Sequence, residues 1–248
     1  MRYLIISDLH ANWEALSAVI EAARGSYDEV LCLGDLVGYG ADPNRVVDWV
    51  RANSACVVRG NHDKACAGLD DLEWFNPIAQ RAARWTMEAL TAENLEYLRA
   101  LPSGPMLVAD DFQIFHGGPL DEDEYIVSTY EASHQMEYVQ TPVSWFGHTH
   151  LQGGFRLLRG AGVRKVERIT KDADSLVLEI ERDGLYVLNP GSVGQPRDGD
   201  ARAAWAIYDT EERIAVFRRV CYDIKSCQDK ILKAGLPEPL AFRLEVGS

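Results

Sequence analysis

The segment Leu4-Ile5-Ile6-Ser7-Asp8-Leu9-His10 joins a buried strand to two residues that can bind a metal. Residues 2–7 are apolar at nearly every position, which is typical of a strand covered on both faces. Four more short apolar runs end in the same way, at Asp35, at Asn61, at His116, and at His148 with His150. Ligands bind beyond the carboxyl ends of strands in a parallel sheet. We therefore expect the tips of five strands to converge on one polar, metal-binding site.

Strands and helices alternate in the first half of the chain. Asn76-Pro77 and Asp42-Pro43 have the form of a helix N-cap followed by proline at the first helical position. Thr91 can cap a further helix that ends before Pro102. Apolar residues at three- and four-residue spacing predict a helix from Trp13 to the stop at Gly25. This β-α-β-α-β order predicts a mostly parallel sheet with helices against it. We expect strands at 2–7, 29–33 and 55–59, and helices at 13–24, 43–52, 77–90 and 92–101.

Short strand-like runs dominate after about residue 103. Asp183-Gly184 between two of them favours a hairpin. We expect a second, largely antiparallel sheet packed on the first, and hence an α/β (α+β) fold. No linker divides the chain, so residues 1–248 are expected to form a single domain in which both halves build the site. The expected elements are strands at 105–109, 112–116, 143–147, 153–158, 164–170, 175–181, 184–188, 203–209 and 212–219, helices near 131–139 and 223–234, and a tail rich in proline and polar residues.

Composition limits the classes of function. The 248 residues are 47 % hydrophobic and 25 % charged, which is the balance of a globular protein with a core. The net charge of −13 makes a nucleic-acid partner unlikely, because nucleic-acid binding relies on Lys and Arg. No apolar run approaches the roughly 20 residues of a membrane helix, and no signal-peptide layout is present. The five cysteines are scattered without a C-x-x-C pair, which fits a reducing cytoplasm.

The candidate ligands comprise two carboxylates and five neutral side chains. Seven ligands are too many for one tetrahedral ion. Two ions about 3.5–4 Å apart, bridged by one carboxylate, would use them all. Imidazole with carboxylate suits transition metals, so we expect two divalent ions such as Mn, Fe or Zn. The candidate ligands are Asp8, His10, Asp35, Asn61, His116, His148 and His150.

The spacing of these residues also suggests a local geometry. Side chains two positions apart in an extended segment point the same way, so Asp8 and His10 are expected to reach one metal together. His148 and His150 can do likewise, or can splay onto two neighbouring ions. Gly34, Gly60 and Gly147 precede ligands at strand tips, where the absence of a Cβ permits a tight turn and a close approach.

His62 lies beside the candidate ligand Asn61 and need not be a ligand itself. We expect it to donate a hydrogen bond to a phosphoryl oxygen or to protonate a leaving group. Asp63 is expected to orient the imidazole of His62. Together the two residues form the predicted catalytic pair of the site.

Five blocks of the sequence resemble those of the calcineurin-like metallophosphoesterases, in the same order and the same strand-tip setting. The blocks are Asp8-Leu9-His10, Gly34-Asp35-Leu36-Val37-Gly38, Gly60-Asn61-His62-Asp63, His116 and Gly147-His148-Thr149-His150. Any one block alone would be weak, whereas the five together are specific. The resemblance implies two packed mixed sheets flanked by helices, an α/β/β/α sandwich. It also implies one ion held by Asp8, His10, Asp35 and His150, and a second held by Asp35, Asn61, His116 and His148.

Two features refine the resemblance. The stretch from Asp8 to Asn12 and the loop Asn189-Pro190-Gly191-Ser192-Val193-Gly194 resemble the small bacterial phosphodiesterase branch. The protein serine/threonine phosphatases of the superfamily have an arginine soon after the second-block aspartate. Here the segment is Leu36-Val37-Gly38-Tyr39-Gly40, which argues against a protein phosphatase.

Several other residues near the blocks have both a functional and a simpler interpretation. Arg197 is a candidate for binding substrate phosphate, although a solvated loop arginine is at least as common. Trp74, Phe75 and Tyr125 would line a pocket, with core packing as the simpler expectation. The run 121–124 is expected to be a solvated acidic loop that could also repel polyanions. His134 is expected to be a surface or packing residue.

The resulting hypothesis is a hydrolase, a metal-dependent phosphodiesterase or phosphomonoesterase of a small phosphorylated substrate, in which metal-bound hydroxide attacks phosphorus. Two alternatives remain open at this stage. One is a metal-dependent nuclease of the same superfamily, and the other is a non-catalytic metal-binding scaffold. The sequence does not predict the oligomeric state.

Overall fold

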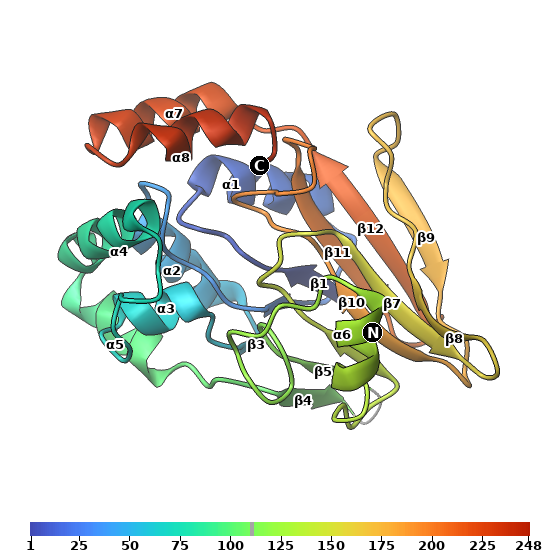
Figure 1. The fold of residues 1–248 in the computed structure, drawn as a ribbon. Coiled ribbons are helices and arrows are strands. Elements are labelled where there is room, and N and C mark those ends of the chain that lie inside the picture. The colour runs from blue at the N-terminus through green and yellow to red at the C-terminus, as the bar shows by residue number, and fades with distance from the viewer. Residues whose placement is uncertain (110–111) are drawn as a thin grey trace.

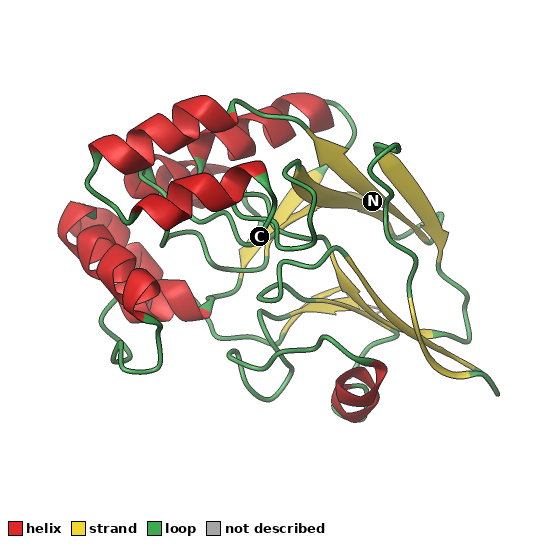
Figure 2. Ribbon diagram, turned by 45° about the horizontal axis from the view of Figure 1, so that its top comes forward, coloured by secondary structure: helices red, strands yellow, loops and turns green. Residues whose placement is uncertain are grey.

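The computed structural model describes residues 1–109 and 112–248 of the chain (Figure 1). Two six-stranded sheets pack face to face, with most helices on the outer face of one sheet and a single short helix on the outer face of the other (Figure 2). The expected fold class, two packed mixed sheets flanked by helices, is confirmed. The strands are β1 (Arg2–Ile6), β2 (Glu29–Cys32), β3 (Cys56–Val57), β4 (Met106–Ala109), β5 (Phe112–Ile114), β6 (Val143–Trp145), β7 (Gly153–Leu158), β8 (Gly162–Lys165), β9 (Ser175–Glu179), β10 (Leu185–Asn189), β11 (Ala203–Asp209) and β12 (Ile214–Val220).

Two of the three suggested N-caps, Asn76 and Thr91, make side-chain capping bonds, whereas Asp42 stands at the N-cap position of the helix Pro43–Asn53 without such a bond. The Asn76 side chain accepts hydrogen bonds from the first turn of α4, and the Thr91 hydroxyl accepts one from α5. No helix among the described residues is long and apolar enough to cross a membrane. The helices are α1 (Trp13–Ala23), α2 (Pro43–Asn53), α3 (Asn61–Cys66), α4 (Pro77–Ala89), α5 (Ala92–Ala100), α6 (Thr129–Gln135), α7 (Ile224–Lys233), α8 (Glu238–Phe242) and the 3₁₀ turn η1 (Arg243–Glu245).

The strands are divided between the sheets differently from the expectation. The first sheet has the order β3-β2-β1-β11-β12-β9 and the second β4-β5-β6-β10-β7-β8. Each sheet contains two parallel strand pairs and three antiparallel ones. The predicted hairpin at Asp183-Gly184 is wrong, because β9 pairs with β12 in the first sheet while β10 pairs with β6 and β7 in the second. The turn at Asp183 therefore crosses from one sheet to the other.

Alternation along the strands builds two cores at once. In β1, Leu4 and Ile6 face the helices, whereas Tyr3 and Ile5 face the second sheet. Every one of these four side chains is buried, which explains the continuous apolar run in the sequence. A third cluster fills the space between the second sheet and α6. The first sheet is therefore covered on both faces, and its strand tips emerge between the layers.

Two short helices differ from the sequence-based expectation. Residues 61–66, which follow the third strand, form α3, so Asn61 and His62 lie in its first turn. The tail after residue 234 forms α8 and η1, which pack beside α7. These turns are too short to show a helical period in the sequence.

Candidate metal centre

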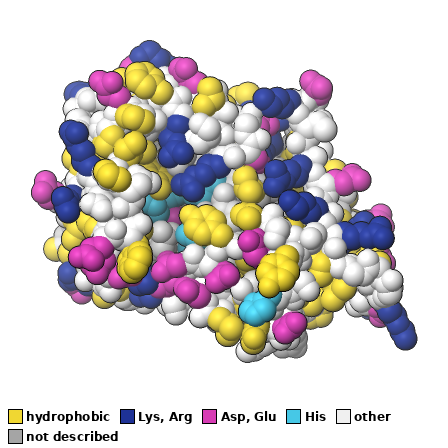
Figure 3. All heavy atoms as spheres, viewed as in Figure 1, with side chains coloured by type: hydrophobic (Ala, Val, Ile, Leu, Met, Phe, Trp, Pro, Cys, Tyr) yellow, Lys and Arg dark blue, Asp and Glu magenta, His cyan; other side chains and the backbone are white. Residues whose placement is uncertain are grey.

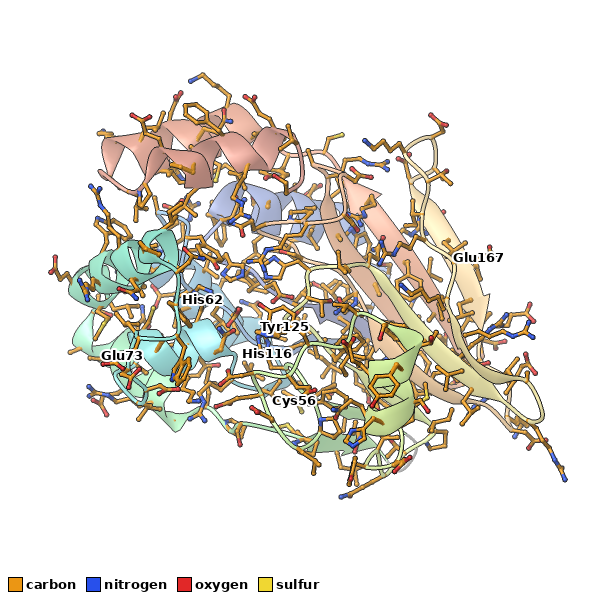
Figure 4. All side chains as sticks on the ribbon, viewed as in Figure 1. Cys56, His62, Glu73, His116, Tyr125 and Glu167 are labelled. Atoms are coloured by element: carbon orange, nitrogen blue, oxygen red, sulfur yellow. The ribbon has the colours of Figure 1, made fainter. Side chains whose placement is uncertain are left out.

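The structure brings the seven candidate ligands to one place, at the tips of the strands. Asp8 follows β1, Asp35 follows β2, and His116 follows β5. His148 and His150 follow β6, and Asn61 opens α3 directly after β3. The aspartates and histidines of this set are all buried. Figure 4 shows His62 and His116 close to one another in the middle of the molecule, whereas Glu167 lies at its outside.

The ligand atoms form two groups that share one carboxylate. Asp8, His10, Asp35 and His150 offer atoms that all lie within 4.8 Å of one another. Asp35, His116 and His148 form a second group on the same criterion. Asn61 Oδ1 lies 3.2 Å from His148 Nδ1, which places the amide beside the second group. The two groups therefore meet at Asp35.

The backbone at the ligands adopts a conformation that sequence spacing did not suggest. Asp8, His10, Asp35, His148 and His150 all have positive φ, between 46° and 61°. The expectation that the two ligand pairs lie in extended segments is therefore wrong. Left-handed backbone is unfavourable for residues other than glycine, and such strain is concentrated at functional sites. The strand tips turn sharply here, which directs successive ligands inward.

The tautomers of three histidines follow from their backbone contacts. In each, Nδ1 lies within hydrogen-bond distance of a carbonyl oxygen. A carbonyl only accepts, so Nδ1 must carry the proton, and Nε2 presents a lone pair whenever the ring is neutral. A metal-binding histidine commonly has its second nitrogen held in this way. The pairs are His10 with Val37 (3.1 Å), His116 with Leu33 (2.7 Å) and His150 with Gln195 (2.5 Å).

These lone pairs face other acceptors, which is unfavourable without a cation. His10 Nε2 lies 3.1 Å from His150 Nε2. An oxygen of Asp35 lies 3.6 Å from His10 Nε2. In addition, Asp8 Oδ2 is buried and has no hydrogen-bond partner among the described residues. Buried polar atoms normally have partners, so these residues fit a site for metal ions.

The pKa values of the site follow from burial and mutual charge. Burial lowers the pKa of His148 to about 3 and that of His10 well below its usual value, so both imidazoles are neutral. Burial opposes protonation of His116 as well, but the carboxylates of Asp35 and Asp8 outweigh it and raise the pKa of His116 to about 10. Burial raises the pKa of Asp8 to about 7. Without metal, His116 therefore provides the cation of the site.

Glycines permit the close approach of the strand tips, as expected. A Cβ on Gly60 would lie 2.1 Å from Asp35 Oδ1, and one on Gly147 would lie 2.0 Å from Ser7 Oγ. Gly34 has a φ of +95°, and a Cβ there would lie 2.5 Å from the Gly60 nitrogen. Any side chain at these positions would push Asp8 or Asp35 out of place.

Asp63 has partners other than the expected one. Its Oδ1 accepts hydrogen bonds from the N–H groups of Leu36 (2.8 Å) and Val37 (3.2 Å), and its Oδ2 accepts one from Gly60 (3.1 Å). These bonds tie the loop after Asp35 to the start of α3. The expectation that Asp63 orients the imidazole of His62 is wrong, because the carboxylate is committed to the backbone. Asp63 instead positions the loop beneath the metal centre.

A cleft of about 470 Å³ opens from the metal centre to the surface, and His62 lies in its wall. The imidazole of His62 contacts the rings of Tyr39 (4.4 Å between centroids) and Phe75 (4.7 Å). Its Nδ1 is buried, and no residue in the described part of the chain forms a hydrogen bond with it. Burial lowers the pKa of His62 to about 4, so the ring is neutral at pH 7. Arg197 lies in the same cleft, where its guanidinium donates to Tyr39 Oη (3.3 Å) and to Gln195 Oε1 (3.2 Å).

The rim of the cleft differs from the simpler expectations. Trp74 is 90 % exposed and Tyr125 is 50 % exposed, so the expected core packing is wrong for both. Phe75 is partly buried beside the core. In the acidic run, Glu122 is largely buried and paired with Arg59 at 2.8 Å, so this part of the run is not a solvated loop. His134 is exposed on α6 beside Tyr138, as expected.

The loop after β10 supports the centre in a way that the sequence did not reveal. Asn189 donates to the Gly147 carbonyl oxygen (2.7 Å) and to Thr149 Oγ1 (3.1 Å). Ser192 Oγ donates to the Asp8 carbonyl oxygen (2.8 Å). The run from Asn189 to Gly194 was noted in the sequence, but nothing in it indicated that it fixes the ligand loops of both sheets.

Comparison with known proteins identifies the family. Residues 1–213 match the Calcineurin-like phosphoesterase superfamily domain. The chain belongs to this superfamily of phosphoesterase hydrolases. It is 34 % identical over 256 residues to the uncharacterized protein MJ0912 of Methanocaldococcus jannaschii, covering 98 % of this chain and 97 % of that protein.

Solved structures agree with the assignment. A metallophosphoesterase from Sphaerobacter thermophilus is 40 % identical and superposes with a TM-score of 0.86, covering 100 % of this chain and 99 % of the other. The hypothetical protein PH1004 of Pyrococcus horikoshii is 22 % identical with a TM-score of 0.78, covering 100 % and 98 %, and shares the fold. The family is metal-dependent, and the cluster of Asp and His residues is the candidate metal site of this member.

Proposed function

We propose that this member of the superfamily hydrolyses a phosphodiester or phosphomonoester of a small substrate, with two divalent transition-metal ions such as Mn, Fe or Zn. The observation that supports it best is the pair of ligand groups that share Asp35. Asp8, His10 and His150 would hold one ion with Asp35. Asn61, His116 and His148 would hold the other with it. When bound, the ions act as Lewis acids toward phosphoryl oxygens and activate water.

The chain's own residues would bind and orient the phosphoryl group. His62 is neutral and has an unused Nδ1 in the cleft wall, which suits a hydrogen bond to a phosphoryl oxygen or proton transfer to the leaving oxygen. Arg197 has a guanidinium in the same wall and would bind a second oxygen. Asp63 would keep the loop of Asp35 in register through its three backbone bonds.

The cleft favours a small substrate. Its volume of about 470 Å³ is in the usual range for small-molecule sites. Asp70, Asp71 and Asp123 lie along it, and the net charge is −13. A long polyanion such as nucleic acid would be repelled by this rim. The candidate ligands come from both halves of the chain, which supports a single domain over residues 1–248. The scattered cysteines support a location in the reducing cytoplasm.

A panel of chromogenic esters tests this proposal. The purified protein is stripped of metal, loaded in turn with Mn²⁺, Fe²⁺, Zn²⁺ or Co²⁺, and assayed on bis(p-nitrophenyl) phosphate and on p-nitrophenyl phosphate. We expect turnover with at least one metal and its loss on chelation. An Asp172→Asn variant, which alters an exposed carboxylate that does not line the cleft, serves as a control. Absence of hydrolysis with all four metals would favour the scaffold alternative.

A further inference from the structure

The mouth of the cleft combines exposed aromatic rings with carboxylates. Tyr125 lies with its ring centroid 4.0 Å from that of His148, so it borders the metal centre directly. Trp74 lines the same cleft and leaves 90 % of its surface exposed. The exposed indole therefore presents a ring face at the mouth of the cleft. Tyr125 and His62 line the same cleft, and Figure 4 shows both labelled side chains in the central part of the view.

The carboxylates at this mouth exceed the cations that pair with them. Lys64 Nζ contacts Asp70 at 2.7 Å, Asp123 at 3.3 Å and Glu122 at 3.4 Å. Arg59 pairs with Glu122 as well. The Asp71 carboxylate accepts a hydrogen bond from the backbone N–H of Glu73, and no Lys or Arg among the described residues forms an ion pair with it. The four carboxylates and two cations leave two net negative charges at the aromatic rim.

The opposite side of the cleft has the reverse charge. Arg197 is the one cation among the described residues that line it. Arg243 lies near enough to Arg197 that, with burial, the neighbouring charge lowers its pKa. Figure 3 shows histidine side chains in a hollow with acidic side chains along its lower side and basic ones along its upper side. The cleft therefore has a positive end at the metals and Arg197 and a negative, aromatic end at Trp74 and Asp71.

A ligand that complements both ends of the cleft must carry a negative group for the metals and Arg197 and a positive group for the acidic, aromatic rim. A second phosphate at the rim would be repelled by the carboxylates, and a neutral ring stacked on Trp74 would gain nothing from their charge. An ammonium group satisfies the rings and the carboxylates together, because cations bind the faces of aromatic rings. We propose that the phosphoesterase centre acts on zwitterionic phosphoesters, in which one alcohol bears an ammonium group held between Trp74, Tyr125 and Asp71.

This inference rests on the proposed function and specifies its substrate class. In the reaction, water oxygen bonds to phosphorus, the bond from phosphorus to one ester oxygen breaks, and that alcohol leaves with a proton from water. No oxidant or reductant is involved. The ammonium group takes no part in bond changes and contributes only to binding and position.

Two matched diesters test the inference. p-Nitrophenyl phosphorylcholine and p-nitrophenyl 3,3-dimethylbutyl phosphate have the same leaving group and the same shape, and differ by a nitrogen cation in place of a carbon. We expect kcat/KM to favour the choline ester by about tenfold or more with the best metal. Trp74→Ala and Asp71→Asn should each reduce this ratio by about threefold or more, while Asp172→Asn should leave the ratio unchanged.

The outcomes separate the two levels of the proposal. Hydrolysis of both diesters with a ratio near one overturns the zwitterion inference and leaves the phosphoesterase function intact. If neither diester nor bis(p-nitrophenyl) phosphate is hydrolysed with any of the four metals, the function itself is rejected and the inference with it. A higher rate on the neutral ester would also contradict the inference.

A binding measurement gives a readout that does not depend on turnover. Choline or 3,3-dimethylbutanol is titrated into metal-free protein labelled with ¹⁵N-tryptophan, and the Trp74 indole signal is assigned by its loss in Trp74→Phe. We expect choline to shift that signal and the neutral alcohol to shift it much less. Equal shifts from both, or none from choline, would contradict an ammonium site at the rim.

Discussion

The metal centre and the cleft rim are neighbours that are built by different means. At the centre, the aspartates and histidines are buried, and they are fixed by backbone contacts such as His116 Nδ1 to the Leu33 carbonyl oxygen. At the rim, Trp74 and Tyr125 are exposed on loops held together mainly through Lys64 and its carboxylates. Loops tolerate change better than the strands that support them. On the proposed function, the strand tips would set the chemistry and the loops would set the selectivity.

The largest effect is expected at the shared ligand. Asp35→Asn keeps the size of the side chain and an acceptor for the His62 N–H, but removes the charge between the two ligand groups. Turnover should fall by roughly 10³-fold or more, because the ions contribute several kcal/mol to the transition state. Metal content should fall below two ions per chain. Unchanged metal content and turnover would show that the centre does not depend on Asp35.

The next effect is expected at His62. Its backbone N–H, which donates to Asp35 Oδ1 at 2.9 Å, is retained in His62→Ala. We therefore expect kcat on a chromogenic phosphodiester with Mn²⁺ to fall by about 10²- to 10⁴-fold with no loss of metal. The matched control is His134→Ala, which removes an exposed histidine of α6. Undiminished turnover in His62→Ala would reject the proposed role.

A smaller effect is expected at Arg197, where the centre meets the rim. Loss of its charged hydrogen bond in Arg197→Ala should raise KM by roughly tenfold or more, and Arg197→Lys should recover part of the loss. Arg164→Ala, on the exposed β8, is the control for loss of one positive charge. If the KM of Arg197→Ala equals that of the unmodified protein, Arg197 does not bind substrate and contributes only to the structure of its loop.

The pH dependence of metal binding tests the electrostatics of the centre. The pKa of His116 is raised to about 10 and that of Asp8 to about 7, so both hold protons at pH 6 in the metal-free protein. Ligands must lose their protons to bind metal. Calorimetry in buffers of different ionisation enthalpy should therefore show about two protons released at pH 6 and about one at pH 8. Equal release at both values would contradict the raised pKa of Asp8.

The smallest effect is expected at the rim. Asp70→Asn removes one of three carboxylates around Lys64, in a partly exposed ion pair. Such pairs contribute about 0–1 kcal/mol, so the free energy of unfolding measured in urea should change by less than about 1 kcal/mol. A loss of several kcal/mol would mean that the rim is as rigidly constrained as the metal centre.

The sequence predicted those features that are set by neighbouring residues. The positions of the five ligand-bearing strand tips could be predicted because each buried strand and the polar residue that follows it lie within one short stretch of sequence. The N-caps at Asn76 and Thr91 and the close approach at Gly60 are also local. Together with the family resemblance, these local features were enough to predict the sandwich fold and the cluster of polar residues around Asp35.

Features that depend on distant contacts could not be read in this way. Whether β9 pairs with β10 or with β12 is decided by sheet packing across the molecule, so the hairpin at Asp183 was wrong. The Asp63 carboxylate turns to Leu36 and Val37 because the loop after β2 lies against α3, which spacing does not show. The exposure of Trp74 likewise depends on how its loop lies over the cleft.

Anomalous diffraction from crystals grown with Mn²⁺ tests the central claim most directly. The account predicts two peaks per chain, about 3.5–4 Å apart, on either side of the Asp35 carboxylate, with Asp8, His10 and His150 around one and the remaining ligands around the other. A single peak, or peaks away from Asp35, would contradict the two-metal centre on which the proposed hydrolysis depends.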